Sequence, residues 1–317
     1  MSLGDVYAIV SLWGLRVVAL GFGLLWGSFL NVVIYRVPRD MSVVKPASHC
    51  PGCGKPIAAY DNIPVFSYLV LRGRARCCGV KMSPRYPLVE LIGGLLSLAL
   101  VMVVVEKLPL TTPGLRALAI YGADFAFCMG LVAAAFIDAE HMFLPDSITI
   151  GGTVLGILTA TLRDLPFTES LLGAAAGFVG VWLPFGFLYK RFLGRTGMGL
   201  GDAKLLALAG AWFGWQGAVF VLFGGALQGT IYAGALALFG VKPTLPQAVL
   251  DDIAELEKAA AEGDEEAKKA LEEDPIMEDL DAPRARIPFG PFMILACLEL
   301  LFAGEWIARR LGALFAL

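Results

Sequence analysis

The chain has 317 residues, of which 57% are hydrophobic and only 17% are charged. A water-soluble protein needs more charged residues on its surface than this, so the composition favours a protein embedded in a lipid bilayer. The composition also excludes a disordered chain, a secreted disulfide scaffold and a nucleic-acid binder built on charge. The net charge of −3 is set by residues 241–286, where 14 acidic and 6 basic residues sum to −8 and leave +5 on the remaining residues.

Apolar runs long enough to enter a membrane recur along the whole chain. A transmembrane helix needs about 20 mostly apolar residues. Eight candidate runs cover residues 10–35, 87–105, 117–137, 147–162, 171–189, 203–213, 217–239 and 289–306. The first is too long for a signal peptide, and the sixth, with 11 residues, rises only about 16 Å as a helix. The sequence predicts an all-α polytopic membrane protein with about eight transmembrane helices, the sixth of them short.

These runs divide the chain into five segments. They are a first transmembrane helix (1–36), a cysteine-containing domain (37–86), a transmembrane core (87–240), an acidic insertion (241–286) and a last transmembrane helix (287–317). Between Arg36 and Arg85 there are nine Lys and Arg residues but only two acidic ones. Because cytoplasmic loops carry an excess of Lys and Arg, we expect the cysteine-containing domain to face the cytoplasm.

The acidic insertion predicts a helix followed by a linker. Apolar residues spaced by three and four positions form one helix face: Val249, Ile253, Leu256 and Ala260. A flexible acidic linker is expected to follow through Asp274, Pro275 and Asp281. The helix is either a solvated cytoplasmic surface, as charge runs commonly are, or a docking surface for a basic partner.

Four of the six cysteines fall in the basic loop. Cys50 and Cys53 form a C-x-x-C pair, and Cys77 and Cys78 follow about two dozen residues later. A reducing cytosol disfavours disulfides, so this spacing predicts a structural zinc site, a small zinc-knuckle-like domain between the first two transmembrane helices.

The second half of this zinc site is irregular. Ala75 stands where a second C-x-x-C pair would begin, and the adjacent thiols of Cys77 and Cys78 do not easily face one ion. The ligands are therefore Cys50, Cys53, Cys78 and either Cys77 or His49. The alternative is a loop that has lost its metal. The remaining thiols, Cys128 and Cys297, lie in apolar runs, where cysteine acts as a small hydrophobic residue.

Two carboxylates stand at ends of apolar runs where function is the default expectation. Asp138 follows the third run, and Asp202 follows a glycine-rich stretch just before the sixth. Ionisable groups at membrane depth are costly and usually functional. Two carboxylates at one site would share a proton, so that one acts as an acid and the other as a base. Aspartic proteases use this arrangement to activate water.

Other interpretations of these acidic residues remain open. Asp202 alone could be the N-cap of the sixth helix, and Asp146 fits the N-cap of the fourth better than catalysis. Paired acids also serve ion coupling in transporters. A transporter of that kind should show inverted repeats with broken helices in matching halves, and only one short run is visible here.

Six motifs occur in one order between residues 27 and 292. They are GSFLNVVIYRVP (27–38), the C-x-x-C pair (50–53), SPRYPLVE (83–90), IDAEHMFLPD (137–146), GLGDAK (199–204) and IPFGPF (287–292). With them the sequence resembles the bacterial prepilin leader peptidases. These are a family of aspartic proteases with a Gly-x-Gly-Asp motif.

The resemblance implies a multi-pass enzyme of the bacterial inner membrane. It would cut the basic leader from type IV prepilins or pseudopilins after a Gly on the cytoplasmic side, using Asp138 and Asp202. The resemblance also implies N-methylation of the new N-terminus with S-adenosylmethionine as cofactor. Two features depart from the family: Ala75 replaces the usual third Cys, and the acidic insertion lengthens a loop that is usually short.

Two further classes compete with this interpretation. Presenilin-like proteases share the Gly-x-Gly-Asp motif but carry a Pro-Ala-Leu element near their last spans, where this chain has IPFGP (287–291). A zinc-stabilised assembly subunit of a pilus machine is the non-enzymatic alternative. Cleavage by the purified protein separates it from a peptidase.

Overall fold

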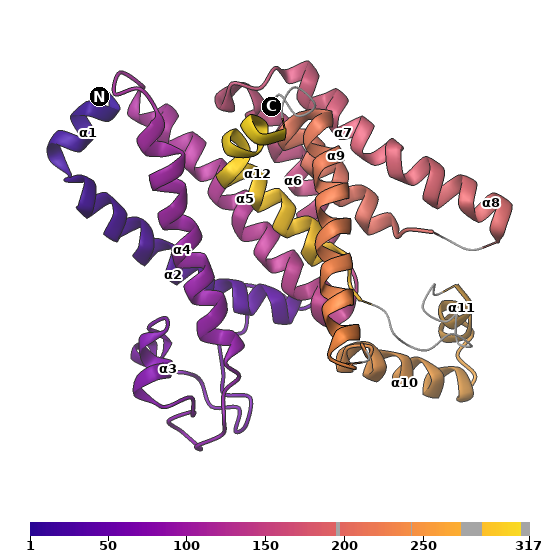
Figure 1. Cartoon of the computed structure of the whole chain (residues 1–317). Helices are drawn as coiled ribbons and strands as arrows, with labels where there is room; N and C mark the ends of the chain where they lie inside the picture. Colours follow the sequence, from indigo (N-terminus) through magenta and orange to yellow (C-terminus); the bar gives the residue numbers. More distant parts are fainter. Residues whose placement is uncertain (195–196, 242, 274–286, 312–317) are drawn as a thin grey trace. The chain divides into compact units, whose positions relative to one another are not determined.

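The computed structural model describes residues 1–194, 197–241, 243–273 and 287–311 (Figure 1). All regular secondary structure in these residues is helical, which confirms the predicted all-α fold. The expected linker residues Asp274, Pro275 and Asp281 lie outside the described residues. The chain divides into two compact units, Met1–Ala133 and Ala134–Leu317, with the division inside helix α5 (Gly114–His141).

Six helical segments in the described part of the chain are long and apolar enough to cross a membrane. They cover Leu12–Arg39, Arg85–Lys107, Gly114–His141, Phe167–Leu193, Leu200–Leu238 and Gly290–Arg310. Each contains a window whose hydropathy matches a bilayer core, so the chain is a multi-pass membrane protein.

The remaining two predicted runs explain why eight runs give six such segments. The fourth run forms α6 (Asp146–Thr159), only 14 residues long, and ends in the 3-10 turn η4 (Ala160–Arg163). The sixth and seventh runs form the two helical halves of α9 (Leu200–Leu238), which are separated at Gly214, in the gap between the two predicted runs. Gly214, with φ 71° and ψ −178°, interrupts α9 and divides its 39 residues, which would otherwise extend about 58 Å. The number of eight spans stays a prediction.

In the first unit, α2 (Leu12–Arg36) and α4 (Arg85–Val103) pack closely along glycines. A Cβ atom at Gly23 or Gly27 would overlap the backbone of α4. Small residues at such crossings let helix backbones approach, which is how helices associate where lipid removes the usual hydrophobic drive. The buried Ser97 hydroxyl donates a hydrogen bond of 2.5 Å to the Ala19 carbonyl across this contact.

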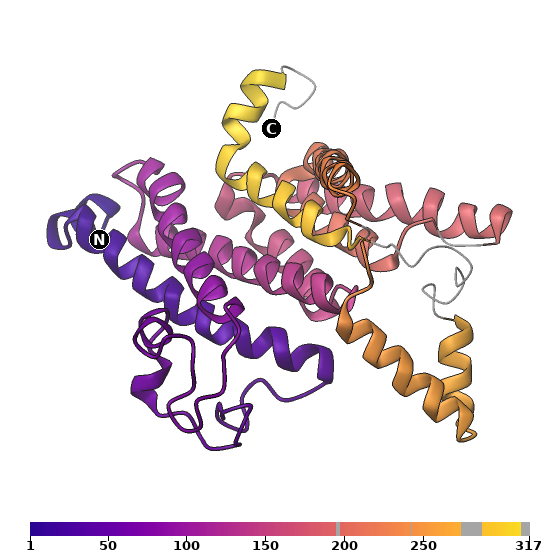
Figure 2. The same cartoon turned by 60° about the horizontal axis from the view of Figure 1, so that its bottom comes forward.

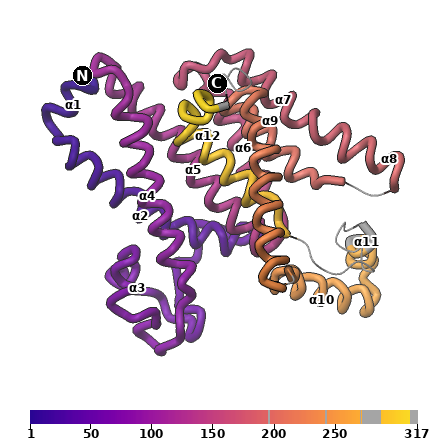
Figure 3. Tube along the Cα trace, in the orientation of Figure 1, coloured from indigo at the N-terminus to yellow at the C-terminus, as the bar shows by residue number. Residues whose placement is uncertain are grey.

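The segment between α2 and α4 contains little regular structure. It includes the 3-10 turns η1 (Val37–Arg39) and η2 (Ala59–Asn62) and the short helix α3 (Phe66–Val70), traced in Figure 3. Glu90 of α4 anchors it: its carboxylate accepts a 2.6 Å hydrogen bond from the backbone N–H of Val65. The first unit also contains α1 (Leu3–Ile9) and the 3-10 turn η3 (Val105–Lys107).

In the second unit, α9 is the helix against which α6, α7 (Phe167–Val181) and α12 (Gly290–Leu311) pack, as Figures 1 and 2 show. A Cβ atom at Gly173 or Gly177 of α7 would overlap the backbone of α9. Met293 of α12 lies over Gly225 of α9 in the same way. Tight glycine contacts therefore determine how α9 packs with its neighbours.

The helix begun by α7 continues through a π-helical turn, η5 (Trp182–Leu188), into α8 (Tyr189–Leu193). Pro184 lies in this turn, and because proline has no N–H to donate it disrupts the regular helical pattern. The amphipathic helix predicted in the acidic insertion is α10 (Gln247–Ala261), with Val249 buried. A second helix, α11 (Glu265–Glu273), follows it and was not expected.

Candidate active site

Asp138 lies in the last turn of α5 and is only 6% exposed. Its Oδ2 atom accepts a hydrogen bond of 3.0 Å from the backbone N–H of Gly290, the first residue of α12. The first N–H groups of a helix have no partner within the helix and carry partial positive charge. The start of α12 therefore holds the Asp138 carboxyl group in place.

Asp202 lies in the first turn of α9, on the third residue of that helix. Gly199, not Asp202, is the N-cap, so the interpretation of Asp202 as an N-cap is wrong. The Asp202 carboxyl group is hydrogen bonded to the backbone of Gly199. This is the geometry in which a side chain three residues into a helix reaches back to its cap. One part of the carboxyl group is thus fixed while Asp202 remains only partly buried.

Leu144 brings the two carboxylates to one place. Its side chain lies against Gly201 of α9 and also against Gly290 of α12: Cβ atoms built at these glycines would lie 3.3 Å from Leu144 atoms in both cases. Asp138 contacts Gly290, and Asp202 follows Gly201, so the two acids flank this contact. The carboxyl groups are close enough to interact electrostatically. The structure thus brings together two acids that are 64 residues apart in the sequence, as their positions 138 and 202 show.

Asp146 does not have the capping role that the sequence suggested. The N-cap of α6 is Pro145, and Asp146 is the first residue of the helix proper. Its carboxylate forms a 2.5 Å ion pair with the Lys204 ammonium, two residues beyond Asp202. Asp146 is 61% exposed in this pair, so it connects α6 to α9 at the surface.

The four loop thiols form one cluster in the first unit. The sulfur atoms lie within 4.8 Å of one another, with Cys50 to Cys78 at 3.5 Å and Cys53 to Cys77 at 3.2 Å. A tetrahedral zinc site with Zn–S bonds of about 2.3 Å needs sulfur atoms about 3.8 Å apart. The thiols of Cys77 and Cys78 thus both face the cluster despite being adjacent, contrary to the expected difficulty. Of the two candidates for the fourth ligand, Cys77 and not His49 belongs to this cluster.

The backbone around Cys50 suits a metal-binding thiolate. Hydrogen bonds from the backbone of Gly52, and then of Cys53, lower the pKa of the Cys50 thiol to about 6. The thiolate is the form that binds metals, so Cys50 is prepared for a cation at neutral pH. The donor set, four sulfur atoms, is the one that structural zinc prefers.

Two turns with the same hydrogen bonds carry the thiols. In the first turn, the Cys50 N–H donates to the Lys55 carbonyl and the Gly54 N–H to the Cys50 carbonyl, at 2.8 and 2.9 Å. In the second turn the equivalent bonds are Ala75 to Val80 and Gly79 to Ala75, at 2.9 and 2.8 Å. Gly54 and Gly79 both have φ near +70°, at 69° and 71°, which glycine adopts without strain. Ala75 therefore has the position of Cys50, and Cys78 that of Cys53.

Comparison with known proteins shows which family the chain belongs to. Residues 22–104 match the bacterial peptidase A24 N-terminal domain, and residues 125–234 match the type IV leader peptidase family. The chain is 36% identical to a prepilin leader peptidase/N-methyltransferase of Myxococcus xanthus, over 92% of this chain and 91% of that protein. The chain belongs to the type IV leader peptidase family. The resemblance inferred from the six motifs is thus confirmed.

Other members of the type IV leader peptidase family are similar over shorter stretches. A prepilin leader peptidase/N-methyltransferase of Dichelobacter nodosus is 38% identical, over 70% of this chain and 83% of that protein. One of Neisseria gonorrhoeae is 38% identical, over 67% of this chain and 78% of that protein. No solved structure matches the chain. The family domain at 125–234 contains both Asp138 and Asp202, and the domain at 22–104 contains the four clustered thiols.

Sequence reasoning missed the contribution of Gly290. The motif 287–292 is conspicuous in the sequence, but the contact of Gly290 with Asp138 joins residues 152 positions apart. The available signal was the pair of glycine and proline residues at the start of the last apolar run, where a helix begins with free N–H groups. Nothing in the sequence indicates that Leu144 contacts both Gly201 and Gly290.

Proposed function

We propose that this chain is an aspartic endopeptidase that cleaves type IV prepilins or pseudopilins after a Gly, with Asp138 and Asp202 as the catalytic residues. The observation that carries this proposal is the meeting of these two acids beside Gly290 in a member of the type IV leader peptidase family. The relatives named above are prepilin leader peptidase/N-methyltransferases, which supports the same substrate class.

The chemistry follows from two carboxyl groups that share one proton. The ionised carboxylate takes a proton from a water molecule as that water attacks the carbonyl carbon of the scissile bond. The protonated carboxyl group donates its proton to the developing oxyanion. When the C–N bond breaks, the carboxyl group that took the water proton gives it to the leaving amine, and the other takes back a proton from a hydroxyl of the intermediate, so both return to their starting states. The Gly290 N–H holds Asp138 at Oδ2, so its other oxygen, Oδ1, is the atom that faces water in this proposal.

Substrate access is proposed at the cytoplasmic face of the inner membrane. The basic loop between Arg36 and Arg85 supports this orientation through the excess of Lys and Arg in cytoplasmic loops. The apolar helix of the prepilin would remain in the bilayer, with the cleavage site at the membrane edge.

The second proposed activity is N-methylation of the new N-terminus. S-adenosylmethionine, when bound, supplies an electrophilic methyl group on a sulfonium sulfur. The chain's own residues would bind this molecule and the uncharged N-terminal amine, exclude water and accept the amine proton. We also propose that the four thiols, Cys50, Cys53, Cys77 and Cys78, hold a structural zinc ion, because their spacing and their donor type fit that ion.

The test is cleavage of a purified prepilin by the purified full-length protein, read by mass spectrometry. Asp138→Asn and Asp202→Asn should each reduce the cleavage rate by more than about 1,000-fold, because each acid has a separate role in proton transfer. Both variants should keep the helical circular dichroism of the wild type. Cleavage at the wild-type rate in either variant would remove that residue from the proposed mechanism.

A further inference from the structure

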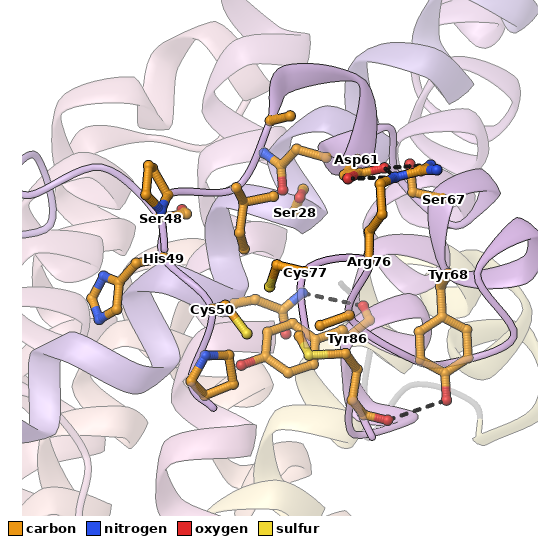
Figure 4. Close-up of a pocket in the computed structure, with 18 of the residues that line it drawn as sticks. Ser28, Ser48, His49, Cys50, Asp61, Ser67, Tyr68, Arg76, Cys77 and Tyr86 are labelled. Atoms are coloured by element: carbon orange, nitrogen blue, oxygen red, sulfur yellow. Dashed lines mark hydrogen bonds and ion pairs between the residues drawn. The ribbon is translucent and has the colours of Figure 1, made fainter. Parts of the chain in front are cut away.

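The first unit contains a cavity that the peptidase chemistry does not use. Its volume is about 690 Å³, in the range typical of small-molecule sites. The end of α2, the cysteine-containing loop and the start of α4 line it, all within Met1–Ala133. Figure 4 shows the Asp61–Arg76 pair on one side of this cavity and Cys50 and Cys77 on another.

Asn31 brings an unsatisfied acceptor to the cavity wall. The residue is 4% exposed, and its side-chain Nδ2 donates to the carbonyls of Gly27 at 3.3 Å and of Tyr86 at 3.1 Å. Two carbonyl partners fix which end of the amide is the nitrogen, so Oδ1 points the other way. Oδ1 is buried and has no hydrogen-bond partner in the protein. Buried acceptors are almost always paired, so Oδ1 calls for a ligand N–H or O–H group.

Arg36 brings a buried cation to the same wall. It is 5% exposed, and its guanidinium donates to the carbonyls of Ser42 and Pro46 at 2.8 and 2.7 Å. A guanidinium has five N–H donors, so further donors remain. Within the described residues Arg36 forms no ion pair with a carboxylate. A buried cation normally has an anionic partner, and a ligand carboxylate would supply one.

The rest of the lining suits a flat base and hydroxyl groups. Four tyrosines contribute to it: Tyr35, Tyr60, Tyr68 and Tyr86. Aromatic rings stack on flat bases and attract cations such as a sulfonium group. The Asp61 carboxylate is held by both oxygens at 2.9 Å from Arg76 Nε and keeps lone pairs that can accept from hydroxyls.

We infer that this cavity is the binding site for S-adenosylmethionine. The inference rests on the methyl transfer in the proposed function and adds the location and the residues. The carboxylate of S-adenosylmethionine would pair with Arg36, and its amino group would donate to Asn31 Oδ1. Its adenine would stack on the tyrosines, and its ribose hydroxyls would donate to Asp61. A nucleoside triphosphate is the competing ligand class, because Arg74 and Arg76 also line the cavity, and the binding test separates the two classes.

The test is equilibrium binding of S-adenosylmethionine and of S-adenosylhomocysteine to the purified full-length protein. The variants are Tyr60→Ala and Asn31→Leu. Tyr60 is 64% exposed, so its replacement leaves the fold intact. Each variant should raise the dissociation constant at least about tenfold, the effect of losing one stacking or hydrogen-bonding partner. ATP should not compete.

Trp306→Ala is the matched control. Trp306 is an exposed aromatic residue with Arg310 5.7 Å from its ring centre, as Tyr60 has Arg76 at 5.6 Å, but it lies in α12. This variant should bind as the wild type does. Prepilin cleavage in the same samples shows that each variant is folded.

Three outcomes would contradict these assignments, and each contradicts a different part of them. Wild-type affinity in both Tyr60→Ala and Asn31→Leu would overturn the cavity assignment while leaving methyl transfer intact. Displacement of bound S-adenosylmethionine by ATP would overturn the ligand class. A wild-type protein that cleaves prepilin but binds no S-adenosylmethionine would remove the methyltransferase part of the proposed function and, with it, this inference.

Discussion

Cys50 and Ala75 occupy equivalent positions in two turns of the same backbone shape. Each turn ends in a glycine with positive φ, Gly54 in the first and Gly79 in the second. The first turn offers a thiol at its starting position, whereas the second has a methyl group there. Cys77, two residues further on, supplies the missing sulfur atom to the cluster.

This equivalence predicts a rescue of zinc binding. Cys77→Ser should weaken zinc affinity by more than about 100-fold, since even the loss of a residue that only supports a ligand costs 10–100-fold. Adding Ala75→Cys to that variant should restore most of the affinity, because position 75 has the geometry of Cys50. The measurement is zinc retained against a competing chelator, quantified by elemental mass spectrometry.

Cys128→Ala serves as the control for thiol loss in general. Cys128 is fully buried in α5 and lies outside the cluster, so the zinc content of the Cys128→Ala variant should equal that of the wild type. A double variant that binds no more zinc than Cys77→Ser alone would contradict the proposed equivalence of the two turns.

Gly290→Ala should slow prepilin cleavage by roughly 10- to 100-fold. A Cβ atom at Gly290 would lie 2.5 Å from Asp138 Oδ2, closer than packed atoms allow, so the carboxyl group must move. Displacements near 1 Å in a catalytic group cost about 100-fold in rate. Gly304→Ala, in the same helix with open space around it, should leave kcat unchanged. Equal rates for the two variants would show that the Gly290 contact does not position Asp138.

Asp146→Asn should cleave prepilin within about twofold of the wild-type rate. Its ion pair with Lys204 is largely exposed, and exposed pairs contribute about 0 to 1 kcal/mol to stability. Asp146 therefore provides a comparison acid near the proposed site that should tolerate the change that inactivates Asp138 and Asp202. A loss of activity as large as that of Asp202→Asn would assign Asp146 a direct catalytic role.

Gly210→Ala should lower the thermal stability of the detergent-solubilised protein, with a cost of roughly 1 to 3 kcal/mol for overpacking. The added methyl group would overlap the backbone of Gly173 where α7 and α9 cross. Gly180→Ala in α7 meets nothing within 4 Å and should be neutral or slightly stabilising, because alanine favours helix over glycine. The melting temperatures of the two variants, followed by circular dichroism, check the prediction. If Gly210→Ala melts no lower than Gly180→Ala, the close approach does not stabilise the unit.

Much of the helical architecture could be predicted because apolar runs of membrane length have few alternatives to helix. The run 117–137 and the helix α5 that contains it agree well, and so do the Val249 pattern and α10. The break in α9 lies at Gly214, between the predicted sixth run, which ends at residue 213, and the seventh, which begins at residue 217. The form of this break could not be predicted, because a glycine there is compatible in sequence with either a loop or a kink, and Gly214 makes the kink by its backbone conformation alone.

The two carboxylates could be predicted individually, but their support could not. Asp138 and Asp202 stand out because charged groups at the ends of apolar runs are costly. The contacts that join them, through Leu144 and Gly290, depend on tertiary packing of three helices. The same holds for the thiols. The adjacency of Cys77 and Cys78 predicts an unfavourable geometry for one ion, whereas the second turn brings both sulfur atoms into the cluster.

The cavity shares Cys50 and Cys77 with the thiol cluster, since both residues line it. A metal that holds those two side chains also holds part of the cavity wall, whereas Asp138 and Asp202 lie in the other unit. Depleting cells of zinc would then produce pilins with correctly cut but unmethylated N-termini. The modification state of the assembled fibre would thus report on the metal supply of the bacterium that made it.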